Sequence, residues 1–199
     1  MRGALVAGVA ALALLGCSSD GDDARVDRSA TTVVSDASAV EPAANESTST
    51  TTYAQADEPP AVVNTGTDFE AIVESFVAYM EWLAAHPDPS LVREIAEEGS
   101  RGWQQNHDVI RQLADSGTRF DGERPAYVAE VRVDRQPDES SVQLYVVVVN
   151  PGYAIVDSSG SAVEEHPDSP PVSAIWGLVR DPAGRWFLRE LTTLGEVPS

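Results

Sequence analysis

Cys17 is the residue whose position predicts a definite chemistry. It is the only cysteine among the 199 residues of the chain, so it cannot form a disulfide within the chain. It follows an apolar run of about twelve residues, 4–15, which is preceded by the positively charged Arg2. This run is shorter than the ~20 residues that a membrane-spanning helix needs, and it has the length of the apolar region of an export signal. We therefore expect export and modification of the Cys17 thiol.

Leu14, Gly16 and Cys17 resemble the bacterial lipobox, with Leu15 where a small residue is commoner. The resemblance implies that the thiol is diacylated and that cleavage removes residues 1–16 as a lipoprotein signal peptide. Two acyl chains, of the palmitate type, suffice for stable membrane attachment. We expect a lipid-anchored protein on the extracytoplasmic face of the cell membrane. The alternative is an ordinary secreted protein with an unpaired thiol.

Other residue patterns with a known chemistry are missing from the sequence. His86, His107 and His166 are far apart along the chain, and there is no second cysteine, so a zinc site is not expected. Ser141 and Ser173 lack the flanking residues of a nucleophile elbow, and no glycine-rich phosphate loop occurs. The sequence therefore predicts neither a metal nor a cofactor.

The charge of the chain excludes one class of partner. It has 32 acidic residues against 13 basic ones, and its formal net charge is −19. Such a charge repels the phosphate backbone, so we expect no binding to nucleic acid. It also repels anionic lipid head groups, which leaves the acyl chains as the expected attachment to the membrane.

The sequence divides into a tether and a domain after the signal peptide. Residues 17–66 are rich in Ser, Thr, Ala, Asp and Pro and have no hydrophobic period. Such a segment buries too little apolar surface to offset the entropy of the chain, which predicts a disordered acidic tether. As a flexible coil it would have an end-to-end distance of ~40 Å. Residues 67–199 form the predicted domain, which is long enough for a single core.

Apolar residues at three- and four-residue spacing predict three helices at the start of the domain. The first covers residues 67–85 and opens with a capping box formed by Thr67 and Glu70. A short second helix covers residues 88–99, and a third covers residues 100–116. Each has an apolar face that would pack against a neighbouring layer.

Beyond the helices, the hydrophobic period changes to two. Residues 127–134 predict a half-buried strand with Tyr127 and Val131 on its inner face, and with Glu130 and Asp134 pointing outward. Further strands are predicted at 142–149, 153–157, 172–180 and 185–191, and a polar, solvent-exposed loop at 158–171. Helices followed by a meander of antiparallel strands predict an α+β domain with the helices on one face of the sheet.

This order of elements resembles the NTF2-like (SnoaL-like) family over about residues 67–194. The residues that carry the resemblance are Phe76-Val77-Ala78-Tyr79-Met80, then His86-Pro87-Asp88-Pro89-Ser90-Leu91, and the closing hairpin at 175–188 with its Asp181-Pro182-Ala183-Gly184-Arg185-Trp186 turn. That hairpin looks like the last one of many small actinobacterial lipoproteins. The resemblance implies a cone in which three N-terminal helices pack on a bent antiparallel sheet of four to six strands. The family includes isomerases, dehydratases, transporter-associated subunits and members without known activity, so it does not fix a function.

Enzymes of this family, as the resemblance implies, place an Asp or His at the mouth of the cone as a general base. His107 is the candidate here, because it shares the apolar face of its helix with Trp103 and Ile110. The alternative is a histidine at the edge of the core that is satisfied by a backbone carbonyl. Glu130 and Asp134 lie on the face that is unsuited to catalysis.

Aromatic residues are the other candidates for a site. They would either line a pocket for a small molecule or fill the cone as ordinary core. Tyr79 and Trp82 lie beside the apolar stripe of the first helix, which predicts an exposed contact surface for a dimer or another partner. The pocket or contact candidates are Tyr79, Trp82, Trp103, Tyr127, Tyr145 and Trp176, and Tyr153 lies on an element that borders the cone.

Two functions from different classes follow from these features. The first is a non-catalytic binding or accessory module outside the membrane, which binds an envelope protein or an apolar small ligand. It is motivated by the anchor, the tether and the lack of a catalytic constellation. The second is an isomerase or dehydratase that acts on a small apolar substrate. The second requires an open cavity in which His107 faces a tyrosine hydroxyl.

Overall fold

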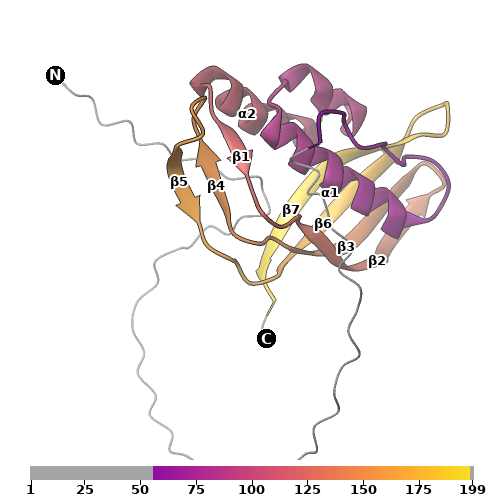
Figure 1. Cartoon of the computed structure of the whole chain (residues 1–199). Helices are drawn as coiled ribbons and strands as arrows, with labels where there is room; N and C mark the ends of the chain where they lie inside the picture. Colours follow the sequence, from indigo (N-terminus) through magenta and orange to yellow (C-terminus); the bar gives the residue numbers. More distant parts are fainter. Residues whose placement is uncertain (1–55, 198–199) are drawn as a thin grey trace, which may run out of the picture. The chain divides into compact units, whose positions relative to one another are not determined.

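The computed structural model describes residues 56–197 (Figure 1). The predicted signal peptide, the predicted lipidation site Cys17 and the predicted tether up to residue 55 lie outside the described residues. The described part is an α+β domain in which helices pack against antiparallel sheets, as the sequence predicts. Within it, no helix is both long enough and apolar enough to cross a membrane.

The three predicted helices are present, with two differences. Helix α1 spans Phe69–Ala85, and its N-cap is Asp68, whose side chain accepts a hydrogen bond from the Ala71 N–H at 3.1 Å. The predicted cap, Thr67, is therefore wrong by one residue, because the Asp68 carboxylate takes the cap position. The second helix, η2, is a 3-10 helix at Pro89–Glu94. Helix α2 spans Arg101–Ser116.

Helix α2 has the capping residues that its sequence indicates. The Ser100 side chain accepts from the Trp103 N–H at 3.1 Å, and Gly117 closes the helix at a φ of 66°. That left-handed conformation is costly for residues with a Cβ atom. Gly102, in the first turn, lies against strand β7 (Trp186–Glu196): a Cβ atom there would meet the backbone carbonyl carbon of Arg189 at 3.0 Å. The helix can therefore approach the strand closely.

The strands form two antiparallel sheets in the described residues, not the single sheet of four to six strands that the sequence predicts. The larger sheet has the order β2-β3-β6-β7, with β3 and β6 at its centre. Its strands are β2 Tyr127–Asp138, β3 Ser141–Val149, β6 Val172–Arg180 and β7 Trp186–Glu196. The smaller sheet has the order β1-β4-β5, with β1 Arg119–Asp121, β4 Tyr153–Val156 and β5 Ala162–His166. Strand β5 lies inside residues 158–171. The prediction that this whole segment is a polar loop is therefore wrong.

Strand β2 contains a bulge that changes which residues face inward. The register shifts between Val128, which pairs with Val148, and Glu130, which pairs with Val147. Val128 and Val131 consequently pack against the core, whereas Tyr127 is 55% exposed. The predicted inner position of Tyr127 is wrong because one extra residue in a strand reverses the alternation of faces. Glu130 and Asp134 are exposed, as predicted.

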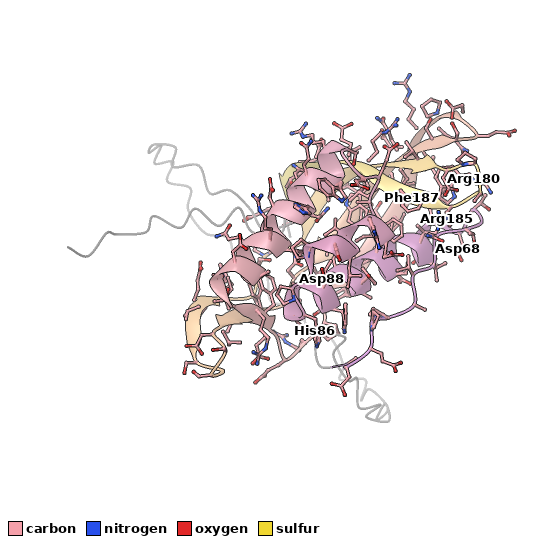
Figure 2. The ribbon with its side chains drawn as sticks, turned by 90° about the horizontal axis from the view of Figure 1, so that it is seen from above. Asp68, His86, Asp88, Arg180, Arg185 and Phe187 are labelled. Atoms are coloured by element: carbon pink, nitrogen blue, oxygen red, sulfur yellow. The ribbon has the colours of Figure 1, made fainter. Side chains whose placement is uncertain are left out.

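Residues 56–66, here called the N-terminal strap, pack against the domain and do not belong to a free tether. The Trp82 Nε1–H donates to Ala56 O at 2.9 Å, the Val63 N–H donates to Ser75 Oγ at 3.0 Å, and the Trp186 Nε1–H donates to Gly66 O at 2.9 Å. The strap runs antiparallel to α1. Figure 2 shows the two ends of that helix, with Asp68 on the side of the β6–β7 turn and His86 at the opposite end.

The strap explains why α1 is buried on almost all sides. A helix that packs on one sheet alone keeps a polar face toward solvent. Here, Tyr79 is 4% exposed and Trp82 is 6% exposed. The exposed contact surface predicted for these two residues is therefore wrong: Trp82 is hydrogen-bonded to the strap, and Tyr79 belongs to the core cluster.

Candidate functional site

An apolar cavity lies between helix α1, the large sheet and the loops beside the small sheet. About 70 Å³ of it can be occupied by the centres of water molecules, which is room for several waters or a small organic molecule. Half of its lining is deeply buried and forms the floor. The floor residues are Phe76, Val77, Met80, Ile95, Asn106, Trp176, Leu188 and Leu191. The other lining residues are partly exposed, except Arg124, which is exposed: Glu81, Phe120, Gly122, Arg124, Ala126, Asn150, Pro151 and Tyr153.

Glu81 is the carboxylic acid in this lining. It lies on α1, and its Oε1 accepts a long hydrogen bond of 3.4 Å from the Ala126 N–H. Its Oε2 is buried and has no hydrogen-bond partner within the described protein. Burial raises the pKa of Glu81 to about 7, and the Ala126 bond opposes that rise. The neutral acid and the carboxylate are therefore both populated near neutral pH.

Tyr153 and Trp176 contribute two further polar atoms without partners. The Tyr153 hydroxyl and Trp176 Nε1 are buried, and neither has a hydrogen-bond partner among residues 56–197. The Tyr153 ring is held between Phe120 and His166, with ring centroids 4.4 Å and 4.5 Å away. Burial, and secondarily the charge of Glu164, raise the pKa of Tyr153. The phenol therefore stays protonated and can donate a hydrogen bond.

These three groups indicate which ligand chemistry the cavity would favour. An indole N–H is only a donor, and a phenol and a neutral carboxylic acid can each donate. A buried polar group without a partner is costly, so the site favours a ligand that brings an acceptor oxygen. Both faces of the Tyr153 ring are already covered by stacked neighbours, so this ring cannot offer a face to a cation. The arrangement suits an apolar molecule that bears a carbonyl, ether or hydroxyl oxygen.

The candidates predicted from the sequence are only partly in this cavity. Trp176 lines it. His107 does not: its ring is stacked on Trp103 with centroids 4.3 Å apart, and its Nδ1 lies 3.8 Å from Asp108 Oδ1. Trp103 packs against the edge of the core. The required meeting of His107 with a tyrosine hydroxyl in the cavity does not occur.

The remaining aromatic candidates are also elsewhere. Tyr79 and Trp82 are buried outside the lining, and Tyr127 is exposed. Tyr145 lies next to Arg132, whose Cζ is 4.1 Å from the centre of the ring. These four residues are not among those that line the cavity.

Glu81 is the functional residue that sequence reasoning missed. The signal was available, because Glu81 is four residues after Val77 and eight after Val73 in the apolar stripe of α1. An acidic side chain on the buried face of a helix needs a hydrogen-bonding or charged partner, or it borders a cavity. No group of three or more His, Cys, Asp or Glu residues in the described part of the chain is placed to hold a metal ion.

Comparison with known proteins gives weak structural likenesses only. No family model matches the sequence, and no curated protein is significantly similar to it. The intermembrane space region of the chloroplast protein ARC6 is 14% identical, with a TM-score of 0.42, over 54% of this chain and 78% of that one. A protein from Catenulispora acidiphila in complex with S-DNPA is 13% identical, with a TM-score of 0.37, over 57% and 82%.

A third similar structure is a nuclear transport factor 2 (NTF2-like) superfamily protein from Salmonella enterica serovar Typhimurium. It is 9% identical, with a TM-score of 0.35, over 62% of this chain and 85% of that one. Similarity at this level assigns neither a family nor a function to the chain. The fold and the cavity themselves define an α+β domain with a pocket of small-molecule size.

Proposed function

We propose that the chain is a lipid-anchored binding protein whose domain takes up a small apolar molecule that bears an acceptor oxygen. The observation that carries this proposal is that three residues lining one apolar cavity, Glu81, Tyr153 and Trp176, each have a buried polar atom without a hydrogen-bond partner among the described residues. A convergent set of polar groups in an otherwise apolar pocket is the common design of small-molecule sites. The order of helices and antiparallel strands supports an NTF2-like cone as the architecture of the domain.

Acetophenone and ethylbenzene are suitable probes, because they have similar shapes and differ in the carbonyl group. We expect acetophenone to shift the Trp176 indole N–H signal in NMR titrations of the domain. Tyr153→Phe removes one donor and keeps the ring stack, so it should weaken acetophenone binding by about tenfold, or ~1.4 kcal/mol. Ethylbenzene binding should change less than twofold.

Tyr145→Phe is the matched control, because it removes a tyrosine hydroxyl from the same domain but outside the cavity lining. It should leave the affinity for both probes unchanged. If neither probe moves the Trp176 signal up to its solubility limit, the domain does not bind small apolar molecules here. If Tyr153→Phe weakens the binding of both probes equally, the Tyr153 hydroxyl has no role in recognising the carbonyl oxygen.

A second candidate, an isomerase or dehydratase, is favoured by the pKa of Glu81, which lies near 7. A general base is most effective when its pKa is close to the working pH. Glu81 would remove a proton next to the substrate carbonyl, and the Tyr153 and Trp176 donors would stabilise the enolate oxygen. The same samples decide this point: in deuterium oxide, catalysed exchange of the acetophenone methyl protons, abolished by Glu81→Gln, would favour the enzyme over the binding module.

The anchor is proposed from the lipobox-like residues that end at Cys17. We expect cells that express the full chain to incorporate radiolabelled palmitate into it and to retain it in the membrane fraction. Cys17→Ser should abolish the label and release the protein, whereas Ser29→Ala, in the same predicted tether, should do neither. Equal fractionation of the Cys17→Ser variant and the wild type would exclude the anchor.

A further inference from the structure

The exposed part of the cavity lining comes mainly from one region of the fold. The floor residues are buried, whereas the partly exposed lining residues, apart from Glu81, come from two segments, 120–126 and 150–153. These segments are far apart in the sequence and meet beside the small sheet. The most exposed route from solvent to the floor therefore runs between them. We call the gap between segments 120–126 and 150–153 the entrance.

One carboxylate joins the two sides of the entrance. Asp168, which follows β5, accepts hydrogen bonds from Arg124 Nη2 at 2.6 Å and 2.8 Å through its two oxygens. Its Oδ1 also accepts from the Gly152 N–H at 2.7 Å. Ser169, the next residue, donates its N–H to Asn150 O at 3.3 Å. We call the contacts of Asp168 with Arg124 and Gly152 the clasp.

The fit around Gly152 shows how closely the clasp is packed. A Cβ atom at this position would lie 3.0 Å from Asp168 Oδ1 and 3.0 Å from His166 O. Only a residue without a side chain allows the two loops to approach in this way. The neighbouring His166 and Tyr153 rings are stacked, so the same region also holds the ring of Tyr153, which lines the cavity.

The clasp is exposed to solvent and is weak enough to open without unfolding the domain. The side chains of Arg124 and Asp168 are 63% and 65% exposed. Exposed ion pairs contribute little to stability, and salt screens them further. Opening the clasp therefore costs far less than unfolding the domain, because the core residues beneath it keep their contacts.

We propose that Asp168 is a positioning residue that holds the two sides of the entrance together and that opening of the clasp speeds exchange between the cavity and solvent. The part of this inference that concerns ligand exchange rests on the proposed function. The part that concerns solvent exchange does not, because water can enter the cavity even if the domain binds no ligand. The two can therefore be tested separately.

The Trp176 indole N–H reports on the entrance without any ligand. It is buried in the floor of the cavity and does not touch Asp168 directly. We expect Asp168→Ala to speed the hydrogen exchange of the Trp176 indole N–H at least tenfold in deuterium oxide, followed by NMR. The Trp186 indole N–H, which is bonded to Gly66 O away from the entrance, should keep its rate and so excludes a general loss of stability.

Asp181→Ala is the matched control. Asp181 also pairs with an arginine, Arg185, at 2.9 Å and accepts its backbone N–H at 2.8 Å, but it lies in the β6–β7 turn outside the cavity lining. This variant should not change the Trp176 rate. In the wild type, 0.5 M sodium chloride should speed Trp176 exchange several-fold, and it should have no such effect in Asp168→Ala. An unchanged Trp176 rate in Asp168→Ala would overturn the assignment of the entrance.

The ligand arm uses acetophenone with the wild type and Asp168→Ala. We expect the association and dissociation rates, from NMR line shapes, to rise together about fivefold while the dissociation constant changes less than twofold. A changed dissociation constant with an unchanged dissociation rate would contradict a gate. If acetophenone does not bind the wild type, the proposed function fails, and the Trp176 exchange still decides whether the clasp closes the cavity.

Discussion

Glu81→Gln is expected to raise the free energy of unfolding at pH 8 by up to about 3 kcal/mol and to leave it nearly unchanged at pH 4. The pKa of Glu81 is raised by burial from 4.5 to about 7, so the folded state binds this proton more tightly than the unfolded state. The favourable contribution is complete below about pH 4.5 and is lost as the pH rises to 7. Glutamine keeps the shape of the neutral acid and cannot ionise.

Urea unfolding of both proteins at several pH values between 4 and 8 measures this difference directly. Glu74→Gln is the control, because Glu74 is on the exposed side of the same helix. The difference between each variant and the wild type is compared at every pH. If the Glu81→Gln difference does not increase from pH 4 to pH 8, Glu81 is solvated and the cavity does not raise its pKa.

Trp186→Ala is expected to lower the free energy of unfolding by about 4 kcal/mol, which is typical of a large aromatic side chain removed from a core. The Trp186 side chain is 1% exposed, and its ring meets Phe69 edge-on at 5.5 Å. It also holds the N-terminal strap at two points, through its N–H to Asn64 O at 2.7 Å and its Nε1–H to Gly66 O at 2.9 Å. Alanine keeps the backbone N–H but removes the ring and the indole bond to Gly66 O, so the substitution should loosen the strap as well as the core.

Urea unfolding gives the loss of stability, and limited proteolysis followed by mass spectrometry locates the loosened segment. New cleavage should appear within residues 56–66 of the Trp186→Ala protein. Trp186→Phe keeps an aromatic ring but loses the indole donor, so it should cost roughly 1–2 kcal/mol. Phe187 is the half-exposed neighbour of Trp186. Phe187→Ala should leave the strap resistant to proteolysis. Equal cleavage of all three variants would show that Trp186 does not hold the strap.

The elements with local signals are those that the sequence predicts well. Helix α2 lies between Ser100, which caps it, and Gly117, which ends it in the left-handed conformation. The β6–β7 hairpin lies around a turn of Asp181, Pro182 and Gly184. These features depend on residues that are neighbours in the chain. Strand β5 has no such signal: it is polar and mostly exposed, and it becomes a strand because β4 is beside it.

The candidate site is only half predictable for the same reason. Trp176 is recognisable as an aromatic residue on a strong strand, and it does line the cavity. His107 has an equally suitable place on its helix, yet its ring stacks on Trp103 outside the cavity. Which face of α2 meets the cavity depends on how the helix packs against β7. The spacing of apolar residues within the helix does not determine this packing. Tyr127 is misplaced by a single extra residue in β2.

The path of the strap decides how a mechanical load on the N-terminal side would reach the core. A pulling force on residue 56 acts first on the hydrogen bond between Ala56 O and Trp82. It acts only later on the hydrogen bonds at Val63, Asn64 and Gly66. These bonds would break one after another, as in peeling, and not all at once. Each strap residue that is released adds up to ~3.5 Å of slack. A protein held by its N-terminal end would thus lengthen under force before its cavity is distorted.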